Sequence, residues 1–275
     1  MNLYSVNTGY FKLDGGAMFG VVPKTIWQKT NPADDKNLCS WAMRSLLIED
    51  GKRLILIDTG IGNKQDEKFL SHYYLHGEDS LEKNLKKHGF SKDDITDVFL
   101  THLHFDHCGG TIERDNNGNF APAFKKAHFW SHSSHWQWAT NPNPREKASF
   151  LKENIHPIEA SGQLKFIDKE KEKFHSAIDI LVVNGHTEAQ MIPHISYQGK
   201  TVVFAADLLP SIGHIPLPYV MGYDTRPLLT MEEKKLFLNN AADKEFKIFL
   251  QHDPVNEWCT VQHTEKGVRL KECGF

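Results

Sequence analysis

The sequence predicts an α/β protein in which helices cover the sheets, organised as a single domain over residues 1–275. Three observations support this. Hydrophobic residues make up 40% of the 275, which is enough apolar material to bury a core. Short apolar runs typical of buried strands alternate with helical segments. No repeat and no linker rich in proline, glycine or serine divides the chain. Such a mixture favours layered sheets and helices over an all-β barrel.

The strands are expected where apolar residues cluster in short runs. These runs are Trp41–Ile48, Arg53–Ile57, Asp97–Leu100, Ala127–Trp130, Ile178–Asn184, Thr201–Ala205 and Lys247–Leu250. A hairpin-like turn is expected at Asn116–Asn119.

Three helices are expected between these strands. Ser80–His88 carries leucines four residues apart and ends before Gly89, a good residue for terminating a helix. Thr230–Ala242 begins with Thr230 and Glu233, whose spacing fits a capping box. Glu146–Asn154 is the third.

Composition excludes several classes of protein. The net charge of −3 gives no basic field for nucleic acid phosphates, so no nucleic acid partner is expected. The four cysteines lack C-x-x-C spacing, so we expect them to be reduced thiols. No secretory signal and no apolar run long enough to cross a membrane is visible, so we expect no membrane partner and a cytoplasmic location.

Histidine is abundant, with 16 residues, and several histidines and aspartates follow directly after apolar runs. Rigid strands that deliver side chains to loops on one side of a sheet commonly build active sites. The strand-end residues are Asp58, His102, His104, Asp106, His107, His186, Asp207 and His252.

Residues 102–107 have the spacing of a metal site. In an extended segment His102 and His104 point the same way and can bind one ion together. If the chain bends at Gly109-Gly110, Asp106 and His107 can face a second ion. Imidazole and carboxylate suit zinc, and catalytic sites typically use three protein ligands and leave a position for water. Two such sites need six or seven ligands, which the strand-end residues after Asp58 supply if one carboxylate is shared.

The H-x-H-x-D-H segment, with His186, Asp207 and His252 downstream, resembles the metallo-β-lactamase superfamily of binuclear metallohydrolases. The resemblance covers Asp58 to His252. It implies a four-layer αββα sandwich of two mixed sheets. It also implies that His102, His104 and His186 bind the first metal, that Asp106, His107 and His252 bind the second, and that Asp207 bridges them. Asp58 would contact a metal ligand without binding the metal itself, and would orient that ligand.

A hydrolase of this kind would use a hydroxide shared by two metal ions. Two zinc ions would lower the pKa of a bridging water, and the hydroxide would attack a carbonyl or phosphoryl centre. Asp106 or Asp207 would carry a proton to the leaving group. Manganese, cobalt or iron also suit these ligands. Cys108, next to the motif, is expected to be structural.

The segment from Leu13 to Lys24 resembles the opening of the quorum-quenching lactonase and methyl parathion hydrolase branch. That likeness implies a substrate pocket lined by Met18, Phe19 and Trp27, with core packing or a dimer contact as the alternative. Acyl-homoserine lactonases carry a tyrosine three residues after the bridging aspartate, where this chain has Pro210.

The loop from His214 to Asp224 is expected to be ordered near the site. Tyr219 or Tyr223 could supply a phenol there, with ordinary packing as the alternative. The aromatic segment 129–138 is expected to cover the cleft or to lie at an interface.

The expected activity is therefore hydrolysis of a small-molecule ester, lactone or organophosphate. The alternatives are a glyoxalase II-type thioesterase, a mononuclear iron dioxygenase of the same fold, and a non-enzymatic metal-binding protein. A homodimer is a candidate assembly.

Overall fold

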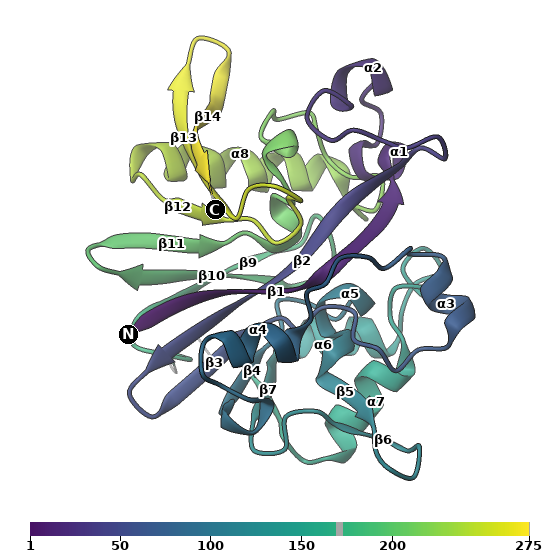
Figure 1. Cartoon of the computed structure of the whole chain (residues 1–275). Helices are drawn as coiled ribbons and strands as arrows, with labels where there is room; N and C mark the ends of the chain where they lie inside the picture. The colour runs from purple at the N-terminus through teal and green to yellow at the C-terminus, as the bar shows by residue number, and fades with distance from the viewer. Residues whose placement is uncertain (169–172, 275) are drawn as a thin grey trace. The chain divides into compact units, whose positions relative to one another are not determined.

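The computed structural model describes residues 1–168 and 173–274, and contacts within the chain divide it into two compact units (Figure 1). The boundaries between the units fall within β1 (Asn2–Asp14) and β2 (Leu38–Asp50). The single domain over residues 1–275 stays a prediction. Unit 1 comprises Met1–Gly9 and Met43–Glu172, and unit 2 comprises Tyr10–Ala42 and Lys173–Phe275.

One mixed sheet of six strands has the order β1-β2-β3-β4-β7-β8. β2 pairs with β3 in the antiparallel direction, whereas β3, β4, β7 and β8 are parallel neighbours. This confirms the four strands predicted between Trp41 and Trp130, while β1 and β8 were not predicted. The other bounds are β3 (Arg53–Ile57), β4 (Asp97–Phe99), β7 (His128–Ser131) and β8 (Leu164–Phe166).

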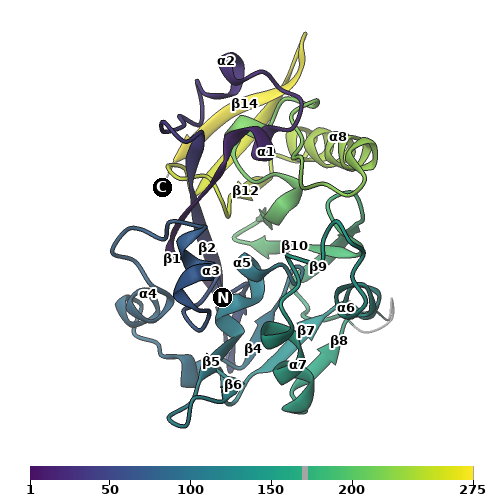
Figure 2. The ribbon, with the colours of Figure 1, turned by 90° about the vertical axis from the view of Figure 1, so that its right-hand side faces the viewer.

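Unit 1 surrounds this sheet with short helices and one hairpin. The predicted helix Ser80–His88 is present, and the Ser80 hydroxyl caps it by accepting the backbone N–H of Lys83. The hairpin turn expected at Asn116–Asn119 joins β5 and β6, against which α7 packs (Figure 2). The elements are α3 (Glu67–Ser71), α4 (Leu81–Lys87), η1 (Lys92–Asp94), α5 (Phe105–Cys108), η2 (Gly109–Thr111), β5 (Ile112–Arg114), β6 (Phe120–Pro122), α6 (Ser133–Thr140) and α7 (Lys152–Ala160).

The second mixed sheet has six strands in the order β14-β13-β12-β11-β10-β9 and belongs to unit 2. Only β11 and β12 are parallel; the other neighbouring pairs are antiparallel. The strands predicted at 178–184, 201–205 and 247–250 are confirmed. The bounds are β9 (Ile178–Val183), β10 (Gln190–Tyr197), β11 (Lys200–Phe204), β12 (Lys247–Phe249), β13 (Trp258–Thr264) and β14 (Gly267–Gly274).

The helices of unit 2 include one long helix, α8, which packs against β13 (Figure 1). Two mixed sheets with helices make the protein α/β, as predicted. Within the described residues, no helix combines the length and apolar composition that crossing a lipid bilayer requires. The remaining bounds are α1 (Gly15–Phe19), α2 (Lys24–Trp27), η3 (Ala206–Leu208), η4 (Ile212–His214) and α8 (Pro227–Asp243).

Two predicted helix starts were wrong. α8 begins at Pro227, so Thr230 lies inside the helix, and the Glu233 carboxylate accepts the backbone N–H groups of Asn184 and Gly185 instead of closing a capping box. α7 begins at Lys152 rather than at residue 146. The stretch before it is a loop, because an asparagine side chain at position 143 accepts the next backbone N–H groups.

Gly109 is required by close packing. A Cβ atom at this position would lie 2.1 Å from the carbonyl oxygen of Ile61, which is backbone and cannot move aside easily. Gly109→Ala should therefore lower the free energy of unfolding by about 2–4 kcal/mol. Gly118→Ala is the control, because its Cβ would meet open space and only its positive φ of 82° costs energy, about 1 kcal/mol. Urea denaturation measures both, and equal losses would contradict this packing argument.

Candidate metal centre

The candidate ligands of unit 1 follow from the direction of its strands. β3 and β4 are parallel, so their carboxyl ends lie at one edge of the sheet, with Asp58 after β3 and His102 after β4. The rings of His102 and His104 have centroids 4.6 Å apart, and those of His102 and His107 lie 3.8 Å apart. The four predicted ligands at 102–107 thus come together at this edge.

The turn that groups these residues begins earlier than expected. His104 is the N-cap of α5, and both Asp106 and His107 lie in that single helical turn. The predicted bend at Gly109-Gly110 was therefore misplaced. Gly109 has an ordinary φ of −58°, and both glycines instead allow close approach of the backbone at Ile61 and Thr59.

Asp58 contacts one candidate ligand directly and a second one through Thr101. Its Oδ2 lies 2.9 Å from Nδ1 of His107, and it accepts the Thr101 hydroxyl at 2.8 Å, while Oδ1 accepts the Thr101 N–H. The same hydroxyl lies 3.1 Å from Nδ1 of His102. Asp58 therefore fixes His107 directly and His102 through Thr101, and these contacts at Nδ1 leave Nε2 of both rings available to a metal.

Asp58 is also conformationally unusual. It is fully buried and has a φ of 57°, in the left-handed region that a residue with a side chain rarely adopts. Such strain persists only where the surroundings impose it, and it is common at functional sites. In unit 2, Ala206, directly before Asp207, has a φ of 42°.

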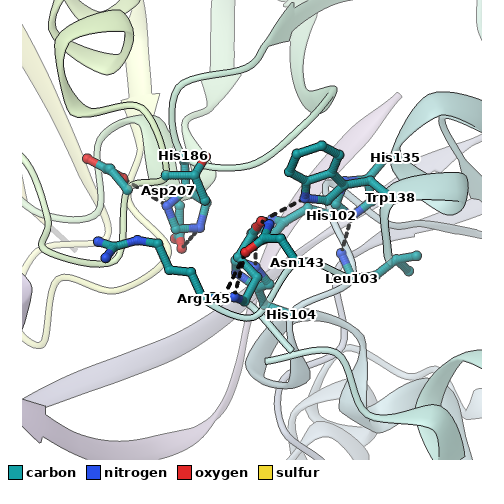
Figure 3. Close-up of polar contacts among 12 residues, drawn as sticks. His102, Leu103, His104, His135, Trp138, Asn143, Arg145, His186 and Asp207 are labelled. Atoms are coloured by element: carbon teal, nitrogen blue, oxygen red, sulfur yellow. Dashed lines mark hydrogen bonds and ion pairs between the residues drawn. The ribbon is translucent and has the colours of Figure 1, made fainter. Parts of the chain in front are cut away.

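Two further buried residues of unit 1 contact the segment 102–107, and neither was singled out as a site residue. Nε2 of His135 accepts the backbone N–H of Leu103 at 2.8 Å (Figure 3). The Glu146 carboxylate lies 3.4 Å from Nε2 of His104. His135 belongs to the aromatic segment 129–138, so that part of the segment supports the candidate ligands from within unit 1.

The candidate ligands of unit 2 also gather at one sheet edge. β10 is antiparallel to both β9 and β11, and β12 is parallel to β11, so β9, β11 and β12 run in the same direction. His186, Asp207 and His252 follow the carboxyl ends of these three strands. The two oxygens of Asp207 face different histidines: Oδ2 lies 3.1 Å from Nε2 of His186, and Oδ1 lies 3.0 Å from Nε2 of His252 (Figure 3 shows His186 and Asp207).

Each of these histidines is held by its other nitrogen. Nδ1 of His186 lies 2.9 Å from the carboxylate of Asp224, and Nδ1 of His252 lies 2.8 Å from the carbonyl of Ala42. Asp224 was not predicted as a site residue. Burial alone would lower the pKa of His186, but the Asp207 and Asp224 carboxylates raise it to about 10. The same negative surroundings would favour a bound cation in place of that proton.

The loop that carries Asp224 is anchored by a buried lysine. Nζ of Lys234 donates to the carbonyls of His214, Pro216 and Tyr219 at 3.0, 3.2 and 2.7 Å. Burial lowers the pKa of Lys234 to about 7. The loop expected from His214 to Asp224 is thus ordered within unit 2.

The predicted pocket residues have different surroundings. Met18, Phe19 and Trp27 are buried, and the Phe19 ring stacks on Trp27 and on His214 with centroids 5.4 and 4.3 Å apart. These contacts fit the core packing that the sequence left open for them. Tyr219 is half-buried and Tyr223 is exposed. The contribution of all five to a substrate pocket stays a prediction.

Cys108 fits its predicted structural role. The side chain is fully buried, its thiol contacts the carbonyl of Leu103, and burial raises its pKa to about 12. A thiol in these surroundings is a poor nucleophile near neutral pH.

His214 should make stability depend on pH. Burial lowers its pKa from 6.5 to about 3, while its ring is held by the Ser211 hydroxyl and the Met18 carbonyl. Between these pH values the unfolded chain binds a proton that the folded chain does not, so stability falls as the pH falls. The slope of unfolding free energy against pH is proportional to the number of protons that unfolding takes up. Below about pH 6.5, His214→Gln should lower that number by about one. Urea titrations of both proteins at several pH values measure this, and an unchanged slope would show that His214 is not buried in the neutral form.

The sequence was compared with models of known protein families and with curated protein sequences. Residues 44–252 match the sequence model of the Metallo-beta-lactamase superfamily. A search of curated protein sequences finds no match.

Solved structures share the fold over nearly the whole chain. A probable metal-dependent hydrolase from Staphylococcus aureus has a TM-score of 0.89 at 28% identity, covering 100% of this chain and 96% of that one. AidC, a dizinc quorum-quenching lactonase in complex with a product, has a TM-score of 0.81 at 24% identity, covering 99% and 94%. The hydrolase AbOPH has a TM-score of 0.80 at 20% identity, covering 99% and 94%. Since the family match spans more than half of the sequence and includes every candidate ligand, the chain belongs to the metallo-β-lactamase superfamily of metal-dependent hydrolases.

Proposed function

We propose that this protein is a dinuclear metal-dependent hydrolase acting on an ester, a lactone or an organophosphate. The observation that carries the proposal is the position of Asp207, whose two oxygens face Nε2 of His186 and of His252 separately. A carboxylate can bridge two ions by offering one oxygen to each. Because both histidines are held at Nδ1, their Nε2 atoms stay directed to the same carboxylate.

The donor count supports two ions. Unit 1 offers four donors and unit 2 offers three, so neither set supplies the six or seven that two catalytic ions need. The family match includes both sets. We therefore assign His102, His104 and His186 to one ion, Asp106, His107 and His252 to the other, and Asp207 to both. Zinc is the proposed metal, with manganese, cobalt or iron as alternatives for mixed nitrogen and oxygen ligands.

The chain's own residues orient these groups and carry protons. Two bound divalent ions would supply an acidified water and polarise the substrate oxygen. Asp58 and Asp224 hold the ligand rings in place from behind. Asp106 is the more accessible of the two candidate proton carriers, with a side chain 13% exposed against 8% for Asp207. We assign the proton transfer to the leaving group to Asp106 or Asp207.

A lactone is one of the three proposed substrate classes, because AidC is a quorum-quenching lactonase and shares the fold. Pro210 occupies the position where the acyl-homoserine lactonases carry a tyrosine, and its carbonyl accepts the N–H of His252. The protein therefore offers no phenol at that position. This keeps esters and organophosphates in the proposal beside lactones.

The proposal also covers the kind of substrate, the binding partners, the location and the assembly of the protein. We propose a small-molecule substrate, no nucleic acid or membrane partner, and a cytoplasmic location. A homodimer remains the candidate assembly.

Substrate class and metal are tested together by a hydrolysis screen of metal-loaded protein. Acyl lactones, aryl esters, thioesters and phosphotriesters are the substrates, and bound metal is quantified by elemental analysis. Two zinc ions per chain with ester, lactone or phosphotriester hydrolysis supports the proposal. Thioester hydrolysis alone favours a glyoxalase II-type enzyme. One iron per chain favours a dioxygenase, and bound metal without hydrolysis favours a binding protein.

Asp207→Ala should lose both metal and activity. Removing the shared carboxylate takes one ligand from each ion, so we expect at least one ion to be lost and kcat/KM to fall by at least about a hundredfold. Asp243→Ala is the control, because that carboxylate pairs with the exposed His263. Full activity and full metal content in Asp207→Ala would overturn the mechanism.

Asp58→Asn should weaken metal binding while the carboxamide keeps the shape of the side chain. An amide cannot accept from Thr101 and His107 as the carboxylate does, so two ligand rings lose their support at once. We expect Zn²⁺ affinity to fall about 10- to 100-fold, measured by competition with a chromophoric chelator. Unchanged affinity would show that Asp58 does not orient the ligands.

A further inference from the structure

β9 is an edge strand of the sheet in unit 2, and it lacks the residues that usually protect an edge. Among the described strands it pairs with β10 alone (Figure 1). Edge strands are commonly protected by charged side chains or proline, because their open backbone groups can pair with another chain. The other edge strand, β14, carries Arg269, Lys271 and Glu272. In β9 only Asp179 is charged, and the other residues are isoleucine, leucine and valine.

The pairing with β10 determines which backbone groups of β9 point out of the sheet. Opposite residues of an antiparallel pair alternate between pairs that exchange hydrogen bonds and pairs that do not. The N–H of Ser196 donates to the carbonyl of Ala177, which fixes this alternation. Ile180 and Val182 then belong to pairs without hydrogen bonds, and Pro193, opposite Ile180, has no N–H to donate. The N–H and C=O groups of Ile180 and Val182 therefore point away from β10.

The open stretch of this edge has defined ends. Before it, the N–H of Ile178 donates to the backbone carbonyl three residues earlier. After it, the N–H of Asn184 donates to the carboxylate of Glu233. Between these ends, the described part of the chain supplies no partner for the outward groups of Ile180 and Val182. Two N–H groups and two carbonyls are thus available to another strand.

The side chains beside these groups are apolar and exposed. Leu181 and Val182 are 39% and 38% exposed, and as neighbours in a strand they point to opposite faces. Leu181 and the 67% exposed Leu236 of α8 line the same groove, which has a volume of about 700 Å³ and includes Phe237 in its wall. An exposed apolar surface next to open backbone groups is typical of a protein interface.

The edge is complementary to itself. If two copies pair in the antiparallel direction about a two-fold axis, Leu181 lies opposite the partner's Leu181. Ile180 of each copy then lies opposite Val182 of the other, and the two pairs exchange four hydrogen bonds. This register uses both open residues of each copy. A shift by two residues would bring in Ile178, whose N–H already has a partner.

We propose that a second copy of this chain covers β9, so that the sheets of two unit 2 regions join into one continuous sheet. The occupant is a second copy because the open hydrogen-bonding groups and the apolar triplet Ile180-Leu181-Val182 match the same triplet in reverse. The inference goes beyond the proposed hydrolysis, which does not depend on it, and gives the proposed homodimer an interface.

Leu181→Lys tests the interface without touching the pairing with β10. It would place two ammonium groups opposite each other at the two-fold axis, where like charges repel. Analytical ultracentrifugation should give the unaltered protein twice the 31.5 kDa mass of one chain. The dissociation constant of the dimer should rise at least about a hundredfold in Leu181→Lys. Leu228→Lys is the control, because Leu228 is 75% exposed on the same helix as Leu236 but lies outside the residues that line the groove.

Leu181→Cys tests the register. Opposite residues in a pair without hydrogen bonds have Cα atoms about 4.5 Å apart, which a disulfide can span. Oxidised glutathione should therefore link two copies of Leu181→Cys, with two molecules of reduced glutathione released. Cys273, the exposed native thiol, is replaced by serine in all samples. Asp179→Cys is the matched control, because this register places the two Asp179 positions four residues out of line, too far apart for a disulfide.

The outcomes separate this inference from the proposed function. A covalent dimer of Leu181→Cys but not of Asp179→Cys supports the inference. A monomeric unaltered protein at every concentration overturns it, because the edge is then covered otherwise or left open. A dimer that Leu181→Lys leaves intact and Leu181→Cys does not link keeps the homodimer but overturns this interface. If Leu181→Lys does not fold, the cross-linking result decides. Failure of the metal-loaded protein to hydrolyse any substrate would count against the proposed function alone.

Discussion

The contacts of the Asp58 carboxylate connect three parts of unit 1 that are far apart in the sequence. The residue follows β3, its oxygens accept from Thr101 after β4, and one of them contacts His107 in α5. All of these groups are buried, so the carboxylate would be costly without its donors. The strained backbone at Asp58 is tolerated because these contacts and the two parallel strands impose it together.

A common principle applies to the candidate ligands of both units. Four of the candidate histidines, at 102, 107, 186 and 252, have Nδ1 in contact with an oxygen of the chain, either a carboxylate, a hydroxyl or a backbone carbonyl. Such contacts fix the orientation of a ring before any ion arrives, which reduces the entropy that binding must overcome. The partners come from loops, from strand ends and, at Ala42, from within β2 rather than from helix interiors. The sheets therefore position the candidate ligands, and loop and strand residues together set their orientation.

The sequence predicted the parts of this structure that depend on local patterns. Apolar runs located seven strands, and the ligands lay directly after them because strands of the same direction end at one sheet edge. Glu146 and Asp224 could not be found in this way, because each carboxylate lies near a histidine that only the folded chain brings close. The capping box at Thr230 and Glu233 failed for a similar reason. A distant pair of backbone N–H groups at Asn184 and Gly185 uses the carboxylate that local spacing assigned to the helix.

The contacts at Nδ1 have a consequence for substitutions at four of the candidate histidines. Nδ1 of His102, His107, His186 and His252 contacts an oxygen of the chain. The amide of asparagine places a polar atom where histidine has Nδ1, whereas the longer glutamine reaches the position of Nε2. At these four positions asparagine would keep the contact within the chain and lose the second nitrogen, whereas glutamine would do the reverse.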